Sequence, residues 1–245
     1  MLLLHAVIGL VLGSFGSVLV GRVPKGESIG GRSHCPHCHA TLGPIDLIPV
    51  LSFLALRGRC RRCKAAISWR YPLLELASAG IFLGVFLAWS LPLLASMLLG
   101  VCLWLFLLIA VIDAEYQGIP DVLNIALLVC AVALRLVPSN LAPLEAGAII
   151  LPVAFFGAQW LLSRGRWVGS GDIILGAGIG ALTGTWWLTL AALAFAYIIG
   201  AVVASVLLLT GQKSRNDHIA FGPFLAIGTA GALLLEDTIR SILFF

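Results

Sequence analysis

Apolar segments long enough to cross a membrane recur along most of the chain. The hydrocarbon core of a bilayer is about 30 Å thick, and an α-helix needs about 20 residues to cross it. Seven segments approach that length, and a shorter one lies between the fifth of them and the next. The eight segments are residues 2–20, 72–90, 93–113, 119–137, 143–163, 173–182, 186–210 and 219–235. The pattern predicts an all-α fold, a polytopic membrane helix bundle of about eight transmembrane helices.

The composition agrees with this pattern. Sixty per cent of the residues are hydrophobic and 11% are charged, whereas roughly a quarter of the residues of an average soluble domain are charged. A water-soluble surface cannot be built from so few charges, so the composition excludes the soluble enzyme classes.

The lysines and arginines are distributed unevenly over the two sides of an eight-helix arrangement. Cytoplasmic loops are enriched in these residues. Thirteen of the fifteen fall in alternate loops: Arg22, Lys25, Arg32, Arg57, Arg59, Arg61, Arg62, Lys64 and Arg70 in the first, Arg164 and Arg166 in the fifth, and Lys213 and Arg215 in the seventh. Only Arg135 and Arg240 fall on the other side of the membrane. We therefore expect these three loops in the cytoplasm and both chain ends outside. The net charge of +4 is explained by this topology and indicates no nucleic-acid partner.

One polar region stands out, at residues 21–71, and it holds most of the charge and four of the six cysteines. We expect a first transmembrane helix at 1–20, a small cytoplasmic loop domain at 21–71 and a bundle of seven helices at 72–245. Small residues in the short segment 173–182 should let neighbouring backbones approach closely. These are Gly176, Ala177, Gly178, Gly180 and Ala181.

The four cysteines of the loop domain form two closely spaced pairs. Cys35 and Cys38 are one C-x2-C pair, and Cys60 and Cys63 are another, with 21 residues between the pairs. Two such turns can close a tetrahedron of sulfurs around a zinc ion. Disulfides are the alternative, which the reducing cytoplasm disfavours. A zinc site with four protein ligands is closed and therefore structural, and metal binding would supply folding free energy to a short loop.

The residues alone leave the metal and its ligands open. Iron binds the same four thiolates, and His34, His37 or His39 can replace a cysteine as a ligand. Cys102 and Cys130 lie in apolar segments and are interpreted as small packing residues.

Three aspartates lie where apolar segments begin or end. Ionisable residues in a membrane are costly and are therefore functional candidates. Asp113 ends the third segment, Asp121 lies near the start of the fourth, and Asp172 follows a G-S-G sequence. Asp172 can alternatively cap a helix, and Asp113 can simply mark the membrane boundary.

The segment after Asp172 is too short to cross the bilayer, because ten residues of helix span about 15 Å. Asp172 can therefore lie below the headgroups, in a cavity lined by protein. Two carboxylates placed together share one proton, since two like charges a few ångströms apart do not both ionise cheaply. One of them can activate a water and the other can protonate a peptide carbonyl, so Asp113 and Asp172 are candidates for peptide hydrolysis.

A series of motifs runs in order through nearly the entire chain. They are Gly13-Ser14-Phe15 with Arg22 and Pro24, Ser33-His34-Cys35-Pro36-His37-Cys38, Asp46-Leu47-Ile48-Pro49-Val50-Leu51-Ser52, Arg57-Gly58-Arg59-Cys60, Ile67-Ser68-Trp69-Arg70-Tyr71-Pro72, Asp113 with Ile119-Pro120-Asp121, Gly169-Ser170-Gly171-Asp172 and Phe221-Gly222-Pro223-Phe224. Together they resemble the type IV prepilin peptidases, a family of membrane aspartic peptidases.

The resemblance implies a site and an activity. Asp113 and Asp172 correspond to the family's catalytic pair, and Asp121 to a residue that starts a helix. The family cleaves the basic leader from prepilins and pseudopilins at the cytoplasmic face of the inner membrane, after a glycine and before an apolar helix. Many members then methylate the new amino terminus with S-adenosylmethionine, and residues 21–71 are the methyltransferase-associated region. The sequence departs from the family at Ser17, where asparagine is usual, and at Ile174, where lysine is usual.

Two other classes of protein are compatible with aspartates in a membrane. A transporter or channel would use them to carry a proton or a cation, but no inverted repeat is visible. A scaffold would use the zinc loop to recruit a secretion partner and would tolerate replacement of Asp113 or Asp172 by asparagine.

Overall fold

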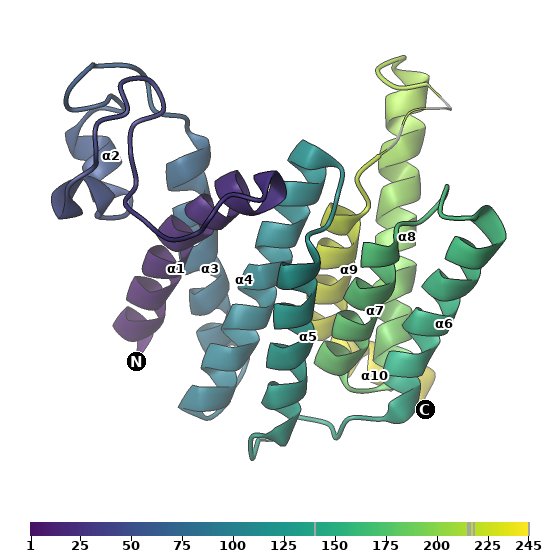
Figure 1. The fold of residues 1–245 in the computed structure, drawn as a ribbon. Helices are drawn as coiled ribbons and strands as arrows, with labels where there is room; N and C mark the ends of the chain where they lie inside the picture. Colours follow the sequence, from purple (N-terminus) through teal and green to yellow (C-terminus); the bar gives the residue numbers. More distant parts are fainter. Residues whose placement is uncertain (140, 215–216, 218, 245) are drawn as a thin grey trace. The chain divides into compact units, whose positions relative to one another are not determined.

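The computed structural model describes residues 1–139, 141–214, 217 and 219–244. Over these residues the chain forms helices, with two isolated β-bridges in the loop domain, so the predicted all-α class is confirmed. Arg215, one of the two cations expected in the seventh loop, lies outside the described residues. The contacts divide the chain into two compact units, Met1–Ser90 and Leu91–Phe245 (Figure 1).

Unit 1 consists of two long helices and the loop domain between them. The long helices are α1 (Leu2–Arg22) and α3 (Arg70–Ala88), and the loop contains η1 (Val23–Lys25), η2 (Pro44–Leu47) and α2 (Leu51–Ala55). A Cβ atom added at Gly9 would lie 2.6 Å from the Cα of Ala79, and one added at Gly13 would lie 2.6 Å from the Cα of Glu75. The two glycines therefore let α1 and α3 pack backbone against backbone, and α3 belongs by its contacts to unit 1.

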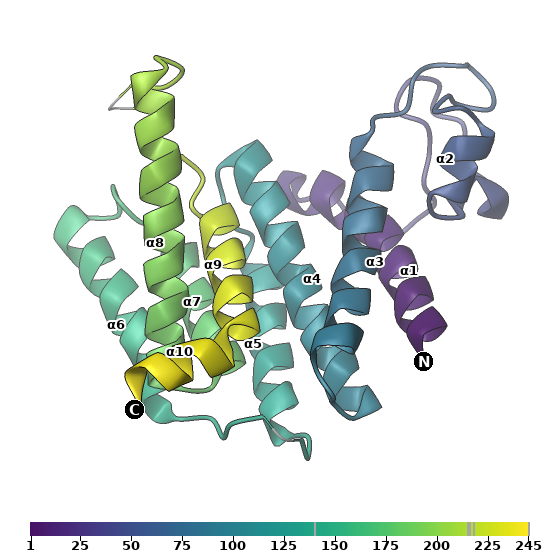
Figure 2. The same ribbon diagram turned by 180° about the vertical axis from the view of Figure 1, so that it is seen from behind.

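Unit 2 consists of six apolar helices that alternate in direction and one short terminal helix (Figures 1 and 2). They are α4 (Leu93–Tyr116), α5 (Asp121–Leu136), α6 (Ala146–Ser163), α7 (Ser170–Thr183), α8 (Trp186–Leu209), α9 (Gly222–Leu234) and α10 (Glu236–Leu243). As a result, α4 ends and α5, α7 and α9 begin at the same end of the unit, the upper end in Figure 1.

Five helices in the described part of the chain are long and apolar enough to cross a membrane. They are Leu2–Lys25, Arg70–Ala88, Leu93–Tyr116, Ala146–Ser163 and Trp186–Leu209. The other three predicted segments also form helices, but α5, α7 and α9 have only 16, 14 and 13 residues. At 1.5 Å per residue these are about 20 to 24 Å long. The chain is a multi-pass membrane protein, and the crossing of all eight helices stays a prediction.

The C-terminal end of the short helix α7 is held by a side chain of α5. At its C-terminal end, Arg135 of α5 donates to the carbonyl of Ala181 at 3.1 Å and to that of Leu182. Carbonyls in the last turn of a helix have no partner within the helix, and water is absent from a bilayer core. From the sequence, Arg135 is only a marker of orientation, whereas in the structure it caps the C-terminal end of α7.

Close packing of α7 on α6 depends on Gly180. A Cβ atom added at Gly180 would overlap the carbonyl group of Ala148 in α6. The predicted close approach at the small residues of this segment is therefore confirmed at Gly180, where two helix backbones meet.

We expect Gly180→Ala to destabilise unit 2 by about 2–3 kcal/mol, because the added methyl group would force α6 and α7 apart. Gly157→Ala is the matched control, since Gly157 lies in α6 with open space around its Cα and alanine favours a helix by about 1 kcal/mol over glycine. Thermal unfolding in detergent measures both variants. A midpoint for Gly180→Ala at or above that of the wild type would contradict the close backbone contact.

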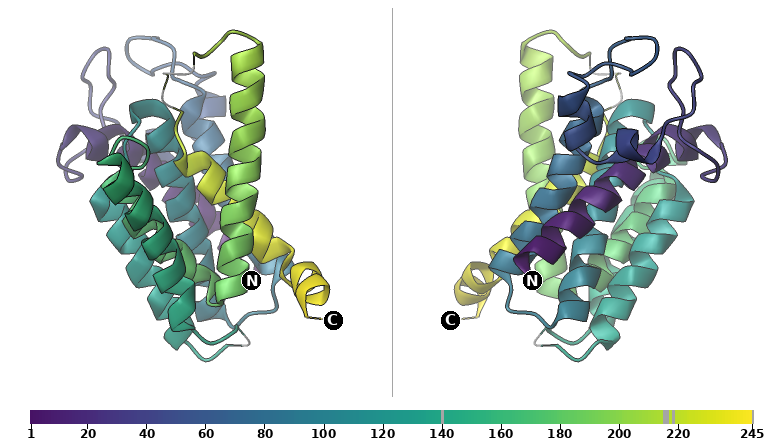
Figure 3. Two further views of the ribbon diagram at one scale, coloured as in Figure 1. Left: turned by 90° about the vertical axis from the view of Figure 1, so that its right-hand side faces the viewer. Right: turned by 90° about the vertical axis from the view of Figure 1, so that its left-hand side faces the viewer.

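The terminal helix α10 was not predicted from the sequence. It places charged residues, such as Glu236 and Arg240, on one side and apolar residues, such as Ile239 and Ile242, on the other. In Figures 2 and 3 it turns away from the axis of α9. An amphipathic helix with this distribution suits the surface of a membrane better than its core.

Candidate active site and metal centre

The two C-x2-C pairs of unit 1 fold into turns of the same shape. In each turn the amide of the first cysteine donates to the carbonyl five residues later, at 3.0 Å for Cys35 and 2.9 Å for Cys60. The residue after the second cysteine has a positive φ, 54° at His39 and 61° at Lys64. The left-handed conformation at that position reverses the chain and brings the two cysteines of each pair to one side.

The four sulfur atoms of these turns form one cluster. The Sγ atoms of Cys35, Cys38, Cys60 and Cys63 lie within 4.8 Å of one another, and all four cysteines are free. The Sγ atoms of Cys35 and Cys63 are 3.8 Å apart, and tetrahedral zinc with Zn–S bonds of about 2.3 Å needs sulfurs about 3.8 Å apart. Among the described residues the cluster contains no histidine. The donor set therefore fits a four-thiolate zinc site.

Backbone amides favour the thiolate form of the first cysteine in each pair. The amides of Cys63 and Arg62 donate to the sulfur of Cys60 and lower the pKa of that thiol to about 6. The amides three and two residues after Cys35 lower the pKa of the Cys35 thiol in the same way. Because metals bind the thiolate, each turn prepares a ligand for the metal.

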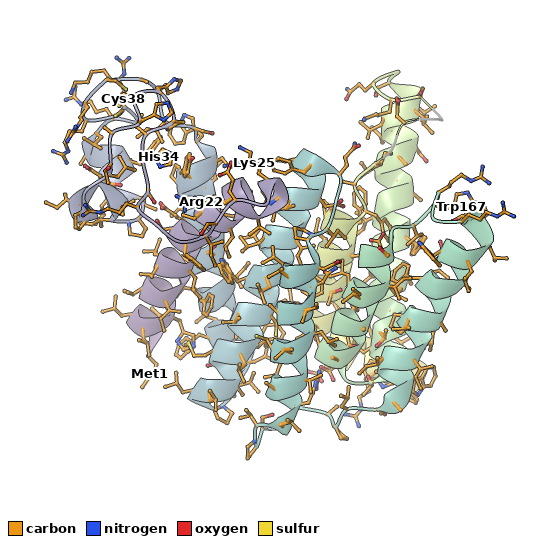
Figure 4. All side chains as sticks on the ribbon, in the orientation of Figure 1. Met1, Arg22, Lys25, His34, Cys38 and Trp167 are labelled. Carbon is orange, nitrogen blue, oxygen red and sulfur yellow. The ribbon has the colours of Figure 1, made fainter. Side chains whose placement is uncertain are left out.

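Two charged side chains shape the rest of the loop domain. The guanidinium of Arg22 donates to the carbonyls of Gly30 at 2.8 Å and Ser28 at 3.2 Å, and Figure 4 shows Arg22 below the loop that carries His34 and Cys38. Asp46 accepts a hydrogen bond from Nε of Arg61 at 2.8 Å. That bond holds the pKa of the Asp46 carboxyl below its usual value and joins the segment between the turns to the second turn.

Glu75 of α3 holds the loop domain at another point. Its Oε2 atom accepts the amide of Val50 at 2.7 Å, and its side chain is buried. Val50 precedes α2 with a φ of 60°, a conformation that a β-branched residue rarely adopts. Glu75 is not among the candidates named from the sequence, although an acidic residue within the apolar segment 72–90 is itself a signal of a specific role.

Asp113 lies in the last turn of α4 and is only 7% exposed. Its Oδ2 atom accepts the amide of Gly222, the first residue of α9, at 2.7 Å. A residue that merely marks the membrane boundary would not be buried between two helices, so the structure favours a specific role for Asp113.

Asp172 is the third residue of α7, so the helix begins earlier than the sequence indicates. Its Oδ2 atom accepts the amide of Gly169 at 2.9 Å, which caps the N-terminus of the helix. The charge of Asp113 acts on Asp172, and the charge of Asp172 acts on the Tyr197 hydroxyl. The two carboxylates therefore share one electrostatic environment in unit 2.

Asn124, in the first turn of α5, joins that helix to the start of α7. Its Nδ2 atom donates to the carbonyl of Gly171 at 2.9 Å, and its side chain is fully buried. A Cβ atom added at Gly171 would lie 3.3 Å from the Cβ of Ile119, so the glycine lets the two segments pack closely. Asp121 begins α5 and is exposed, which confirms its prediction as a residue that starts a helix.

An apolar cavity of about 250 Å³ lies between α8 and the start of α9. It is lined by Tyr197, Gly200, Ala201, Ala204, Ile219, Phe221 and Phe224. Phe221 precedes the glycine that binds Asp113, so the cavity adjoins the carboxylate pair.

Both units match families of known proteins. Residues 7–89 match the family described as Bacterial Peptidase A24 N-terminal domain, and residues 100–205 match the Type IV leader peptidase family. The candidate zinc ligands lie in the first match, and Asp113 and Asp172 lie in the second. No solved structure matches the chain.

Curated relatives resemble the chain over almost its full length. It is 37% identical to the prepilin leader peptidase/N-methyltransferase of Bacillus subtilis (strain 168), over 98% of this chain and 97% of the relative. It is 35% identical to the protein of the same name from Dickeya chrysanthemi, over 96% and 93%, and 33% identical to that from Pseudomonas aeruginosa, over 95% and 89%. The chain therefore belongs to the type IV leader peptidase family.

Proposed function

We propose that this family member is an aspartic endopeptidase in which Asp113 and Asp172 are the acid and base pair. The observation that carries the proposal is that the end of α4 with Asp113 and the end of α7 with Asp172 lie at the same end of unit 2, with Asp113 buried. Carboxylates in one poorly solvated site share a proton. Such a pair needs no nucleophilic side chain to hydrolyse a peptide bond.

The proposed reaction is the addition of water to the scissile carbonyl. The ionised carboxylate takes a proton from the water as its oxygen attacks the carbonyl carbon, and the protonated carboxyl gives its proton to the carbonyl oxygen. The tetrahedral intermediate then loses the amine, which leaves with the proton that the first carboxylate took from the water. The second carboxylate takes a proton back from a hydroxyl of the intermediate as the product carbonyl forms, so both carboxyl groups return to their starting state.

The substrates that we propose are prepilins or pseudopilins, which lose a basic leader after a glycine. Relatives named prepilin leader peptidase/N-methyltransferase support this substrate class. The apolar cavity beside Phe221 supports it too, since apolar residues follow the cleavage site in such substrates. The names of the relatives also support methylation of the new amino terminus, for which S-adenosylmethionine supplies the methyl group when bound. The cleavage step requires water alone.

We propose zinc as the metal of the four-cysteine cluster, with a structural role. The fit of the sulfur spacing to tetrahedral zinc supports this choice. Residues 21–71 would then form a metal-stabilised loop domain associated with methyl transfer, and Arg22 and Glu75 would anchor it to α1 and α3.

We propose that the carboxylates and the zinc loop face the cytoplasm from the inner membrane. In unit 2 the helix ends that carry Asp113 and Asp172 lie at the same end of the unit as the loops with Arg164, Arg166 and Lys213. Loops rich in cations stay in the cytoplasm. The basic leader of a prepilin would reach the site from the same side.

Cleavage of a prepilin by the purified protein tests the proposal. The protein in detergent or lipid is mixed with a prepilin, with and without S-adenosylmethionine, and the products are identified by mass spectrometry. We expect a product that lacks the leader in both samples and, with S-adenosylmethionine, a further gain of about one methyl group. An intact substrate in both samples would reopen the transporter and scaffold hypotheses.

A further inference from the structure

The Phe221-Gly222-Pro223-Phe224 motif has no part in the mechanism above, yet it lies at the carboxylate pair. The motif begins α9, which packs in unit 2 on α4 and α8 (Figure 2). Gly222 is the first residue of the helix, and Pro223 is the second.

The amides at the start of α9 show what the motif does. The first four amides of a helix have no carbonyl to bind in the preceding turn of that helix. In α9 the amides of Phe224 and Leu225 both donate to the carbonyl of Phe221, at 3.0 and 3.1 Å. Pro223 has no amide hydrogen. Of the first four amides, that of Gly222 is left to donate outside the segment, and its acceptor is Asp113 at 2.7 Å. The amide of Phe221, just before the helix, also bonds to the Asp113 carboxyl.

The close approach of the two residues depends on the missing side chain of Gly222. A Cβ atom added there would lie 3.0 Å from Oδ2 of Asp113 and 3.1 Å from its Cβ. Those distances are shorter than van der Waals contact, so any side chain would push the carboxylate away from the amide.

The bond also differs in kind from the one that Asp172 makes. Asp172 binds an amide three residues earlier in the same segment, whereas Asp113 binds an amide 109 residues later. The Gly222 bond therefore fixes one carboxylate of the pair relative to a different helix, and an amide donor favours the charged form of a carboxylate.

We propose that Gly222 is a positioning residue of this peptidase, whose amide orients the Asp113 carboxylate and stabilises the single negative charge of the pair. The inference rests on the proposed role of Asp113.

The test compares the rate of prepilin cleavage against pH for wild type, Gly222→Ala and Gly231→Ala. Gly231 lies on the same helix, and an added Cβ would be at an ordinary 3.6 Å from Phe195. We expect Gly222→Ala to cleave about tenfold more slowly or worse at neutral pH, as for loss of a hydrogen bond to a charged group. The acidic limb of its profile should move about one pH unit higher, because a less stabilised charge is lost at higher pH. Gly231→Ala should follow the wild type.

A wild-type rate and pH profile for Gly222→Ala would overturn the inference. If Asp113→Asn is inactive in the same assay, the proposed function stands and only the role of Gly222 is wrong. If Asp113→Asn is active, the catalytic assignment itself fails.

A stability measurement keeps the inference testable where Gly222→Ala folds poorly. Thermal unfolding is compared for Gly222→Ala in the wild-type and in the Asp113→Ala background, where the carboxylate is absent. We expect a much smaller loss of stability in the second background, because the two residues interact. Equal losses in both backgrounds would show that Gly222 acts elsewhere.

Discussion

Replacing either Asp113 or Asp172 by asparagine should lower the rate of leader cleavage by about 10³-fold or more, without unfolding the helices. Asparagine has nearly the shape of aspartate, and its Oδ1 atom can still accept the amide of Gly222 or of Gly169. It cannot take up or release a proton at neutral pH, and proton transfer by a positioned side chain contributes about 10²- to 10⁴-fold to a rate. Since each carboxyl is needed for one of two coupled transfers, either substitution should suffice.

Asp121→Asn is the matched control for this prediction. Asp121 is exposed at the start of α5, two residues after Ile119, which packs on Gly171. We expect its variant to cleave within a few-fold of the wild-type rate. Initial rates of product formation, measured by mass spectrometry, and thermal unfolding of each variant give the comparison. Wild-type cleavage by either Asp113→Asn or Asp172→Asn would show that the peptidase uses other groups.

The apolar pattern predicted the helices because each of them, long or short, presents apolar residues to lipid or to its neighbours. It placed the boundaries less well. The helix that carries Asp172 begins at Ser170, because Gly169 and the Asp172 carboxylate cap it, and that cap depends on the conformation of three residues. The short helix α10 was missed, because its alternation of charged and apolar residues contains no long apolar stretch.

The site residues were predictable from the sequence where their residue type is unusual for its surroundings. Aspartates in apolar surroundings and paired cysteines are costly or unusual, so they stand out in a single sequence. Contacts made by common residues do not stand out. The buried amide of Asn124, the amide of Gly222 and the cap that Arg135 places on α7 all join segments more than 40 residues apart, and only folding reveals which residues meet.

The family match changes the weight of the competing hypotheses. A transporter or a scaffold was compatible with aspartates in a membrane, but relatives over 97% and 93% of their lengths are named as peptidases. Membership therefore favours an enzyme, while the roles of Asp113, Asp172 and the cysteines rest on the geometry described above.

Loss of the metal should unfold the loop domain and leave unit 2 folded. Cys35→Ser removes one of four thiolates, and the binding free energy of a structural zinc, about 10–16 kcal/mol in small zinc domains, is the main source of stability for such a loop. Few apolar side chains of the loop domain are buried besides Phe53, so its own core cannot replace the metal. We expect the zinc content to fall from about one ion per chain to less than about a tenth, and residues 21–71 to become sensitive to protease.

Cys130→Ser is the control for this change, because Cys130 lies in α5, outside the cluster. Zinc and iron are measured by elemental analysis of the purified protein, and limited proteolysis followed by mass spectrometry locates the cuts. We expect Cys130→Ser to keep its metal and its intact loop. A full complement of zinc in Cys35→Ser would contradict the four-thiolate site, and iron in place of zinc in the wild type would confirm the ligands but correct the metal.

Because the carboxylate pair lies in unit 2, cleavage should decline less in Cys35→Ser than methylation does. Equal losses of both activities would show that the loop domain is needed for cleavage as well.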